Sequence, residues 1–172
     1  MVAVGFGEAA QKFGRPGWAA LVVMLALVVP SNLLVTNEYY RLMLRNGGSL
    51  VWTDAIYPLS DFLKSVSATQ VTPIDWGILD SLKLLHDGKL PLRNGMDPLA
   101  KRALNAADQQ VVRELLNTPG TVFISHTDAN EQFPGVNGRL EAVARDCGLE
   151  KDSLAILADR HGRQIFEVFR YK

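Results

Sequence analysis

The sequence has only one cysteine, Cys147, among its 172 residues. A single cysteine excludes an internal disulfide and any metal site built from several cysteines. The chain also lacks an excess of charge, because 18 basic residues balance 18 acidic ones. A neutral chain has no long-range field to draw it to nucleic acid, so nucleic acid is not an expected partner. Cys147 is expected on the apolar face of a helix, in the core.

Familiar catalytic and cofactor motifs are missing as well. The sequence contains no phosphate-binding loop, dinucleotide fingerprint, nucleophile elbow or zinc-binding helix. It has no internal repeat and no low-complexity segment. No cofactor, no metal and no catalytic residue is therefore predicted from motifs.

One long apolar run is present near the N-terminus. No charged side chain occurs between Pro16 and Asn37, and the run Gly17–Val35 has about the length that crosses a hydrocarbon core. Trp18 on one side and Tyr39 on the other suit the two membrane interfaces. We expect residues 1–36 to form a membrane-spanning helix with a short flank, and the lipid bilayer to be a partner.

Two alternatives to a spanning helix are weaker. A signal peptide has a shorter apolar stretch and a small-x-small cleavage site, which the segment around Pro30 does not offer. A buried helix of a soluble protein is rarely so long and apolar in a small domain. Pro30 is compatible with a spanning helix, where it merely kinks the axis. Basic residues are about equally frequent on both sides of the run, so charge alone leaves the orientation open.

Residues 37–172 are expected to form a soluble α/β domain. Helical character continues past the membrane through Met43 to a stop at Gly47-Gly48. Hydrophobic periodicity and turn residues predict helices near 53–66, 78–86, 105–116 and 136–147, with a helical stretch beginning at 97. The same patterns predict strands at 70–74, 121–125, 154–158 and 164–171. Strands separated by helices should run parallel, and the last two should form a hairpin that adds an antiparallel edge. The expected fold is a three-layer α/β domain with a small mixed sheet.

Two clusters could carry binding chemistry. Asp75 and Trp76 follow the first expected strand, where open α/β sheets place ligands, so Asp75 could bind a hydroxyl while Trp76 stacks on a sugar. The simpler interpretation is that Asp75 caps the next helix. His126, with Asp128 and Glu131, follows the second strand and could bind a ligand or a metal. Ordinary solvated loops are also polar, and no metal-type spacing supports the metal.

Six short segments give the chain a family resemblance. They are NEYY at 37–40, IYPL at 56–59, IDWGI at 74–78, FISHT at 123–127, FPG at 133–135 and DRHGR at 159–163. With the apolar helix, they resemble the C-terminal end of bacterial integral-membrane glycosyltransferases of the protein-mannosyltransferase-like superfamily, which use a polyprenyl-phosphate-sugar donor. The resemblance covers almost the whole chain.

The resemblance implies a non-catalytic role for this chain. The catalytic carboxylates of the superfamily lie in an upstream extracytoplasmic loop that nothing here matches, so the chain would be either a fragment or a stand-alone remnant. It implies an extracytoplasmic domain at the cell membrane. The implied partners are the remaining transmembrane helices, in the same or a separate chain, and a lipid-linked sugar or glycan acceptor.

Two other functions remain open. The chain could be a single-pass membrane-anchored module that binds a saccharide or a partner without catalysis, using Asp75 and Trp76. It could also be a small hydrolase that uses His126 with Asp128 or Glu131. The hydrolase is the weaker alternative, because no nucleophile is suggested by the spacing.

Overall fold

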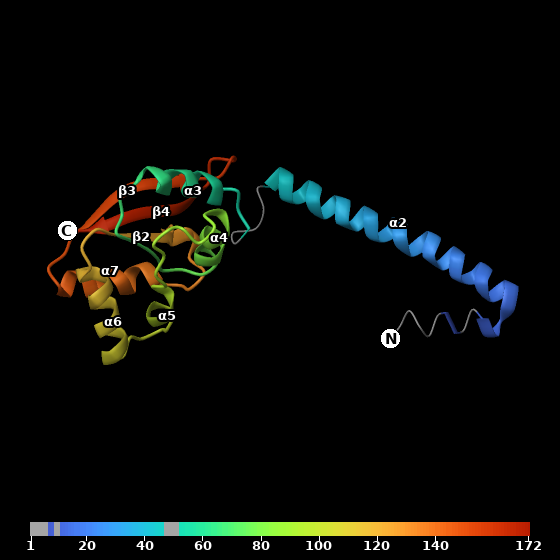
Figure 1. Cartoon of the computed structure of the whole chain (residues 1–172), viewed down its shortest axis with the longest axis horizontal. Helices are drawn as coiled ribbons and strands as arrows, with labels where there is room; N and C mark the ends of the chain where they lie inside the picture. The colour runs from blue at the N-terminus through green and yellow to red at the C-terminus, as the bar shows by residue number, and fades with distance from the viewer. Residues whose placement is uncertain (1–6, 9–10, 47–51) are drawn as a thin grey trace. The chain divides into compact units, whose positions relative to one another are not determined.

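The computed structural model of the chain describes residues 7–8, 11–46 and 52–172. The chain divides into two compact units, Met1–Arg45 and Asn46–Lys172. The first consists mainly of the long helix α2, and the second holds the sheet with its covering helices (Figure 1). Each unit is described separately.

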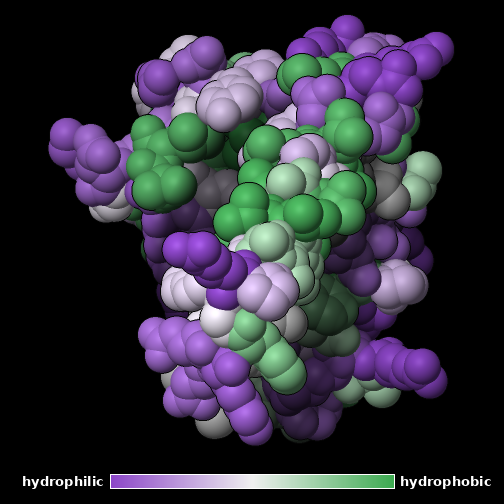
Figure 2. All heavy atoms as spheres, turned by 90° about the vertical axis from the view of Figure 1, so that its right-hand side faces the viewer, coloured by the Kyte–Doolittle hydropathy of each residue, from purple (hydrophilic) through white to green (hydrophobic). Residues whose placement is uncertain are grey.

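The helix α2 runs from Gly14 to Asn46, a length of 33 residues. It is long and apolar enough to cross a membrane, and its most apolar stretch is not buried against any other part of the structure. Figure 2 shows exposed hydrophobic side chains gathered among hydrophilic ones on one face of the molecule. The predicted continuation through Met43 is confirmed, whereas the predicted stop at Gly47-Gly48 lies outside the described residues.

Polar side chains just after Pro30 are satisfied within α2 itself. The Ser31 hydroxyl donates to the Leu27 carbonyl at 2.7 Å, and the Asn32 amide donates to the Val28 carbonyl at 3.1 Å. Proline inside a helix removes one backbone donor, and such side chains are known to bond nearby carbonyls in spanning helices. The polar pair therefore does not interrupt an otherwise apolar segment.

The second unit is built on a four-stranded mixed sheet in the order β1-β2-β4-β3. Its strands are β1 (Gln70–Pro73), β2 (Thr121–His126), β3 (Lys151–Ala158) and β4 (Gln164–Tyr171). The pair β1 and β2 is parallel, while β4 is antiparallel to both β2 and β3. The mixed sheet predicted from the sequence is confirmed.

The last two strands form the predicted hairpin, which adds the antiparallel part at one edge of the sheet. Within this hairpin, β4 lies inside the sheet and β3 forms the edge. The burial of the two strands explains this order. The apolar residues of β4, Ile165, Phe166, Val168 and Phe169, are buried, whereas no residue of β3 is fully buried. A strand that is buried on both faces belongs between two neighbours.

Helices cover both faces of the sheet, which confirms three layers. One core joins the sheet to α3 (Ile56–Ser65) and α4 (Ile78–Leu85). The other core joins it to α5 (Met96–Leu99), α6 (Ala106–Asn117) and α7 (Val136–Asp146). Figure 1 shows α3 on one side of the strands and α5, α6 and α7 on the other. Both cores are formed within the second unit.

One core position that the sequence predicts for α6 is wrong. The apolar residues of 105–116 predict an inner face formed by Val111, Val112, Leu115 and Leu116, but Val111 is exposed while the other three are buried. At 3.6 residues per turn, 111 and 112 point about 100° apart, and the positions 112, 115 and 116 already complete the inner face.

The parallel pairing of β1 with β2 brings the connections that follow these two strands to one edge of the sheet, because parallel strands end at the same edge.

Candidate functional site

A buried pair of hydrogen-bonded polar side chains lies at the carboxyl edge of the two parallel strands. The Nδ1 atom of His126, the last residue of β2, lies 2.8 Å from Oδ2 of Asp75, two residues beyond β1. The side chains are 2% and 0% exposed. The imidazole also lies 5.0 Å from the Phe166 ring. Two of the three predicted binding residues, which are 51 positions apart, are thus in direct contact.

Asp75 has a full set of protein donors. Its Oδ1 accepts from the backbone N–H groups of Trp76 at 2.8 Å and Phe133 at 3.1 Å. Its Oδ2 accepts from His126 and from the backbone N–H of Gln132, both at 2.8 Å. A carboxylate has about four acceptor positions, and all are filled here. The Asp75 side chain therefore joins the loop after β1 to the loop after β2.

These contacts also determine the ionisation of Asp75. Burial by itself raises the pKa of Asp75, because a charged carboxylate loses its water. The hydrogen bonds from His126, Gln132 and Trp76 outweigh burial, and the pKa lies below its ordinary value of 3.8. The carboxylate is consequently held in its charged form at neutral pH.

Asp75 does not cap the helix that follows it. The N-cap residue of α4 is Gly77, which has a φ of 84° and receives no side-chain cap. Glycine adopts this left-handed conformation without steric cost, and it turns the chain from β1 into α4. The first N–H groups of α4 thus have neither a side-chain cap nor partners within the helix.

The other two acidic residues of the β2–α7 loop serve the loop itself. Asp128 accepts from the Asn137 amide at 2.7 Å, and Glu131 accepts from the backbone N–H groups of Gly135 and Asn137 at 2.6 and 2.9 Å. Glu131 thus satisfies orphan donors at the start of α7. Within the described ranges, no group of three His, Cys, Asp or Glu side chains is placed to hold a metal ion.

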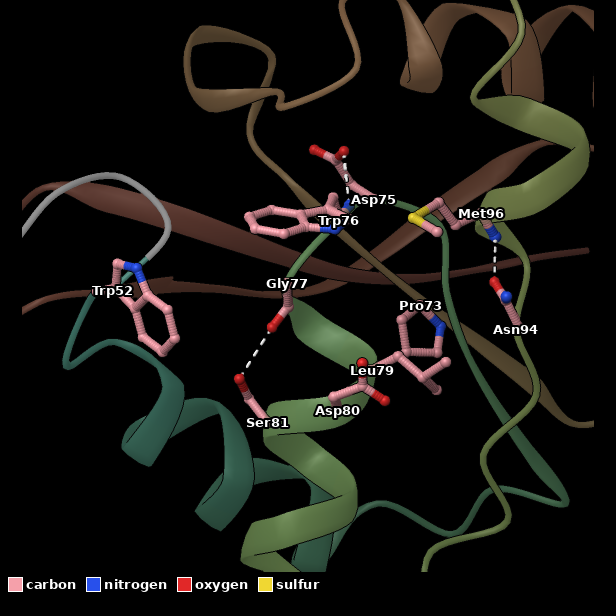
Figure 3. Close-up of a pocket in the computed structure, with 10 residues that line it drawn as sticks. All are labelled: Trp52, Pro73, Asp75, Trp76, Gly77, Leu79, Asp80, Ser81, Asn94 and Met96. Carbon is pink, nitrogen blue, oxygen red and sulfur yellow. Dashed lines mark hydrogen bonds between the residues drawn. The ribbon is translucent and has the colours of Figure 1, made fainter. Parts of the chain in front are cut away.

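A pocket of about 460 Å³ opens beside this edge of the sheet. Two exposed indoles line it, Trp52 at 69% and Trp76 at 48% exposure. Figure 3 shows them next to the first turn of α4, one from the segment before α3 and the other from the connection after β1. The remaining lining residues are Pro73, Asp75, Gly77, Leu79, Asp80, Ser81, Asn94 and Met96.

Polar atoms lie around this pocket among the apolar ones. The Asn94 side-chain oxygen accepts from the Met96 N–H at 2.9 Å, which orients the amide (Figure 3). The Ser81 hydroxyl donates to the Gly77 carbonyl at 2.9 Å and keeps its oxygen as an acceptor. Because the Asp75 carboxylate is fully buried, it supports the pocket wall at Trp76 and does not face the interior.

The predicted residues therefore separate into two groups. Trp76 lines the pocket, whereas His126 is not among its lining residues and lies behind the wall with Asp75. Sequence reasoning missed Trp52, Asp80 and Asn94. A tryptophan four residues after Gly48 was a usable signal for Trp52, but Asn94 lies in an irregular segment that no pattern connects to β1.

The arrangement has the chemistry of a binding site. The pocket offers two aromatic faces, an amide, a hydroxyl and a carboxylate, a set found where orientation of a ligand matters. The Ser81 hydroxyl among the lining residues donates to the Gly77 carbonyl. No known protein family, curated protein or solved structure matches this chain. The resemblance to glycosyltransferases accordingly stays a prediction.

Proposed function

We propose that this chain is a membrane-anchored, non-catalytic domain that binds a saccharide in the pocket between Trp52 and Trp76. The observation that carries the proposal is that pocket, with its two indoles, at the carboxyl edge of β1. Ligands of open α/β folds bind at this edge of the sheet.

The chemistry of the lining favours a sugar. A pyranose has apolar C–H faces, which stack on indoles, and hydroxyl groups around its rim, which need polar partners. Trp52 and Trp76 supply the first, while Asp80, Ser81 and Asn94 supply the second. The uncapped N–H groups at the start of α4 add donors for hydroxyl oxygens. A volume of about 460 Å³ accommodates one or two sugar rings.

The proposed anchor is α2. Its length and its fully exposed apolar surface suit a lipid environment, in which no protein cover is needed. The resemblance to glycosyltransferases supports an extracytoplasmic position for the second unit, at the cell membrane. The saccharide would then be one presented at the membrane surface.

A second proposal joins this domain to an enzyme. The motif resemblance favours a chain that works with the transmembrane helices of a glycosyltransferase, where the domain would hold a lipid-linked sugar or the glycan acceptor. The buried hydrogen bonds of Asp75 and His126 would then act only by holding Trp76, which forms part of the pocket wall. Affinity purification of the full chain from its native membrane tests this, and recovery without a polytopic glycosyltransferase would count against it.

Saccharide binding is tested with the full chain in phosphatidylcholine nanodiscs. Titration with a panel of free and lipid-linked sugars, followed by tryptophan fluorescence in a Trp18→Phe background, should give saturable changes. Trp76→Ala and Trp52→Ala should each weaken binding about five- to 150-fold, because each removes a stacking face worth about 1–3 kcal/mol. Tyr57→Ala is the control, since Tyr57 is an exposed aromatic that does not line the pocket. Absence of saturable binding across the panel would refute the proposal.

A further inference from the structure

The pocket has an unbalanced set of charges. Its ten lining residues include the carboxylates of Asp75 and Asp80 and no lysine, arginine or histidine. The Asp75 carboxylate is buried behind Trp76 and already paired with His126. Asp80 is different, because its side chain is 92% exposed. Asp80 is thus the one lining carboxylate that a ligand can reach.

The N-terminus of helix α4 contributes a positive charge that is smaller than the negative charge of Asp80. Its N-terminal turn lies at the pocket, and a helix N-terminus acts as about half a positive charge. Such a terminus alone favours anions. Asp80, in that same first turn, carries a full negative charge, so the sum at this end of α4 is about half a negative charge. The local field consequently opposes a second anion.

Lys83 is the nearest neighbouring charge: its Nζ lies 3.4 Å from the Asp80 Oδ1, and both side chains are exposed, so water screens their interaction strongly. Lys83 does not line the pocket, so Asp80 is the charged side chain that a ligand in the pocket meets. Arg93 and Asp97 flank the lining residues Asn94 and Met96 in sequence with opposite charges, and neither lines the pocket. Residues 47–51, which precede Trp52, are uncharged in the sequence. Indole faces add attraction for a cation through their negative π surface.

We infer that the pocket discriminates between saccharides by charge, preferring a sugar with a protonated amine to its neutral counterpart and rejecting sugars with a carboxylate or a phosphate. Asp80 is the residue that determines this selectivity, and the two indoles reinforce it. The inference rests on the proposed saccharide site and names the class of ligand within it. In a lipid-linked sugar, the pocket would accordingly hold the sugar ring and leave the phosphate outside.

The test compares matched sugars on the full chain in phosphatidylcholine nanodiscs. At about pH 6, glucosamine, N-acetylglucosamine, glucose and glucuronate are titrated and followed by ligand-observed NMR. Because Asp80 is exposed, the expected effect is modest: glucosamine should bind about two- to fivefold more tightly than N-acetylglucosamine, and glucuronate more weakly than glucose by a similar factor. High salt should reduce both differences.

Two variants distinguish the effect of Asp80 itself from the effect of the protein's net charge. Asp80→Asn should abolish the preference, measured as the ratio of glucosamine to N-acetylglucosamine affinity, because any weakening from a lost hydroxyl contact affects both sugars alike. Asp87→Asn changes the net charge equally, but Asp87 lies beyond the other end of α4 and should leave the preference intact. Equal binding of glucosamine and glucuronate by the wild type, or an unchanged preference in Asp80→Asn, overturns the inference. Failure of every sugar to bind would instead overturn the proposed saccharide site itself.

Discussion

Asp75 is the residue on which the buried polar contacts of the site converge. Four donors from two loops meet its carboxylate, and one of them is the His126 side chain. Removing a buried carboxylate that accepts several hydrogen bonds costs far more than removing an exposed one, because its donors stay buried without a partner. At the scale of single residues, the stability of the domain and the position of Trp76 in the pocket wall therefore depend on one side chain, that of Asp75.

Asp75→Asn should destabilise the domain by about 3 kcal/mol, because the neutral amide loses the charge and turns a donor toward other donors. Urea unfolding of residues 46–172 measures this. Asp152→Asn is the matched control. Asp152 pairs with Arg170 and Lys172 at the surface, where water screens the charges, so its loss should cost clearly less than the loss of Asp75. Similar losses for the two variants would contradict a special role for Asp75.

The depressed pKa of Asp75 also predicts an acid dependence. A carboxyl group with a lower pKa in the folded state stabilises the fold fully above its unfolded pKa of about 3.8. That contribution is lost as the pH falls from about 4 through the folded-state pKa. Urea midpoints measured between pH 6 and pH 2 should fall less steeply for Asp75→Asn than for the wild type. Asp61→Asn, an exposed aspartate paired with Lys64, should keep the wild-type profile.

At the scale of the helices and strands, the stability of α6 depends on the capping of its N-terminus. Its N-cap Asn105 accepts from the Asp108 N–H at 2.8 Å, and the Asp108 carboxylate accepts from the Asn105 N–H at 3.3 Å. This capping box satisfies orphan donors that the rest of the helix cannot reach. Lys101 holds the Asp108 side chain in place at 2.7 Å. The box orients the inner face of α6 against the second core.

Asn105→Ala should therefore cost about 1 kcal/mol of unfolding free energy, through the loss of the cap. The control is Asn117→Ala, at the exposed last position of the same helix, which should change stability by less than about 0.5 kcal/mol. Both variants are measured by urea unfolding of residues 46–172. A cost for Asn105→Ala no larger than that of the control would show that the cap is dispensable.

At the scale of the whole molecule, the two units differ in how their apolar surface is covered. Both hydrophobic cores lie within the second unit, whereas the most apolar stretch of α2 has no protein cover in the described structure. Water would therefore have to hydrate about nineteen mainly apolar residues, which is unfavourable by about 25 cal/mol for each Å². We therefore propose lipid as the environment of this segment.

The full chain should accordingly remain with membranes after an alkaline wash and need detergent for release, while residues 46–172 alone should be soluble and folded. Replacing Leu25 and Val28 with arginine should cost several kcal/mol of insertion, at about 2.5–3.5 kcal/mol for each central arginine. Leu44→Arg, near the end of α2, is the control and should insert normally. Recovery of the wild-type chain as a detergent-free monomer would contradict the membrane anchor.

Local patterns in the sequence were sufficient for most of the fold. The uncharged run before Thr36, the apolar stripe of Leu59 and Leu63 in α3, and the buried run of β2 each follow from short-range periodicity. Periodicity is local because the backbone repeats every 3.6 or 2 residues. The three layers and the mixed sheet follow from the order of these elements.

Only the tertiary structure decided how distant residues meet. The insertion of β4 between β2 and β3, the pairing of Asp75 with His126, and the joining of Trp52 with Trp76 and Asn94 around one pocket all depend on the complete sheet. The sequence singled out Asp75, Trp76 and His126 separately but could not show that one lines the pocket while the others lie behind its wall. Contacts across 50 residues depend on which core surfaces are buried together, and that is a property of the folded chain as a whole.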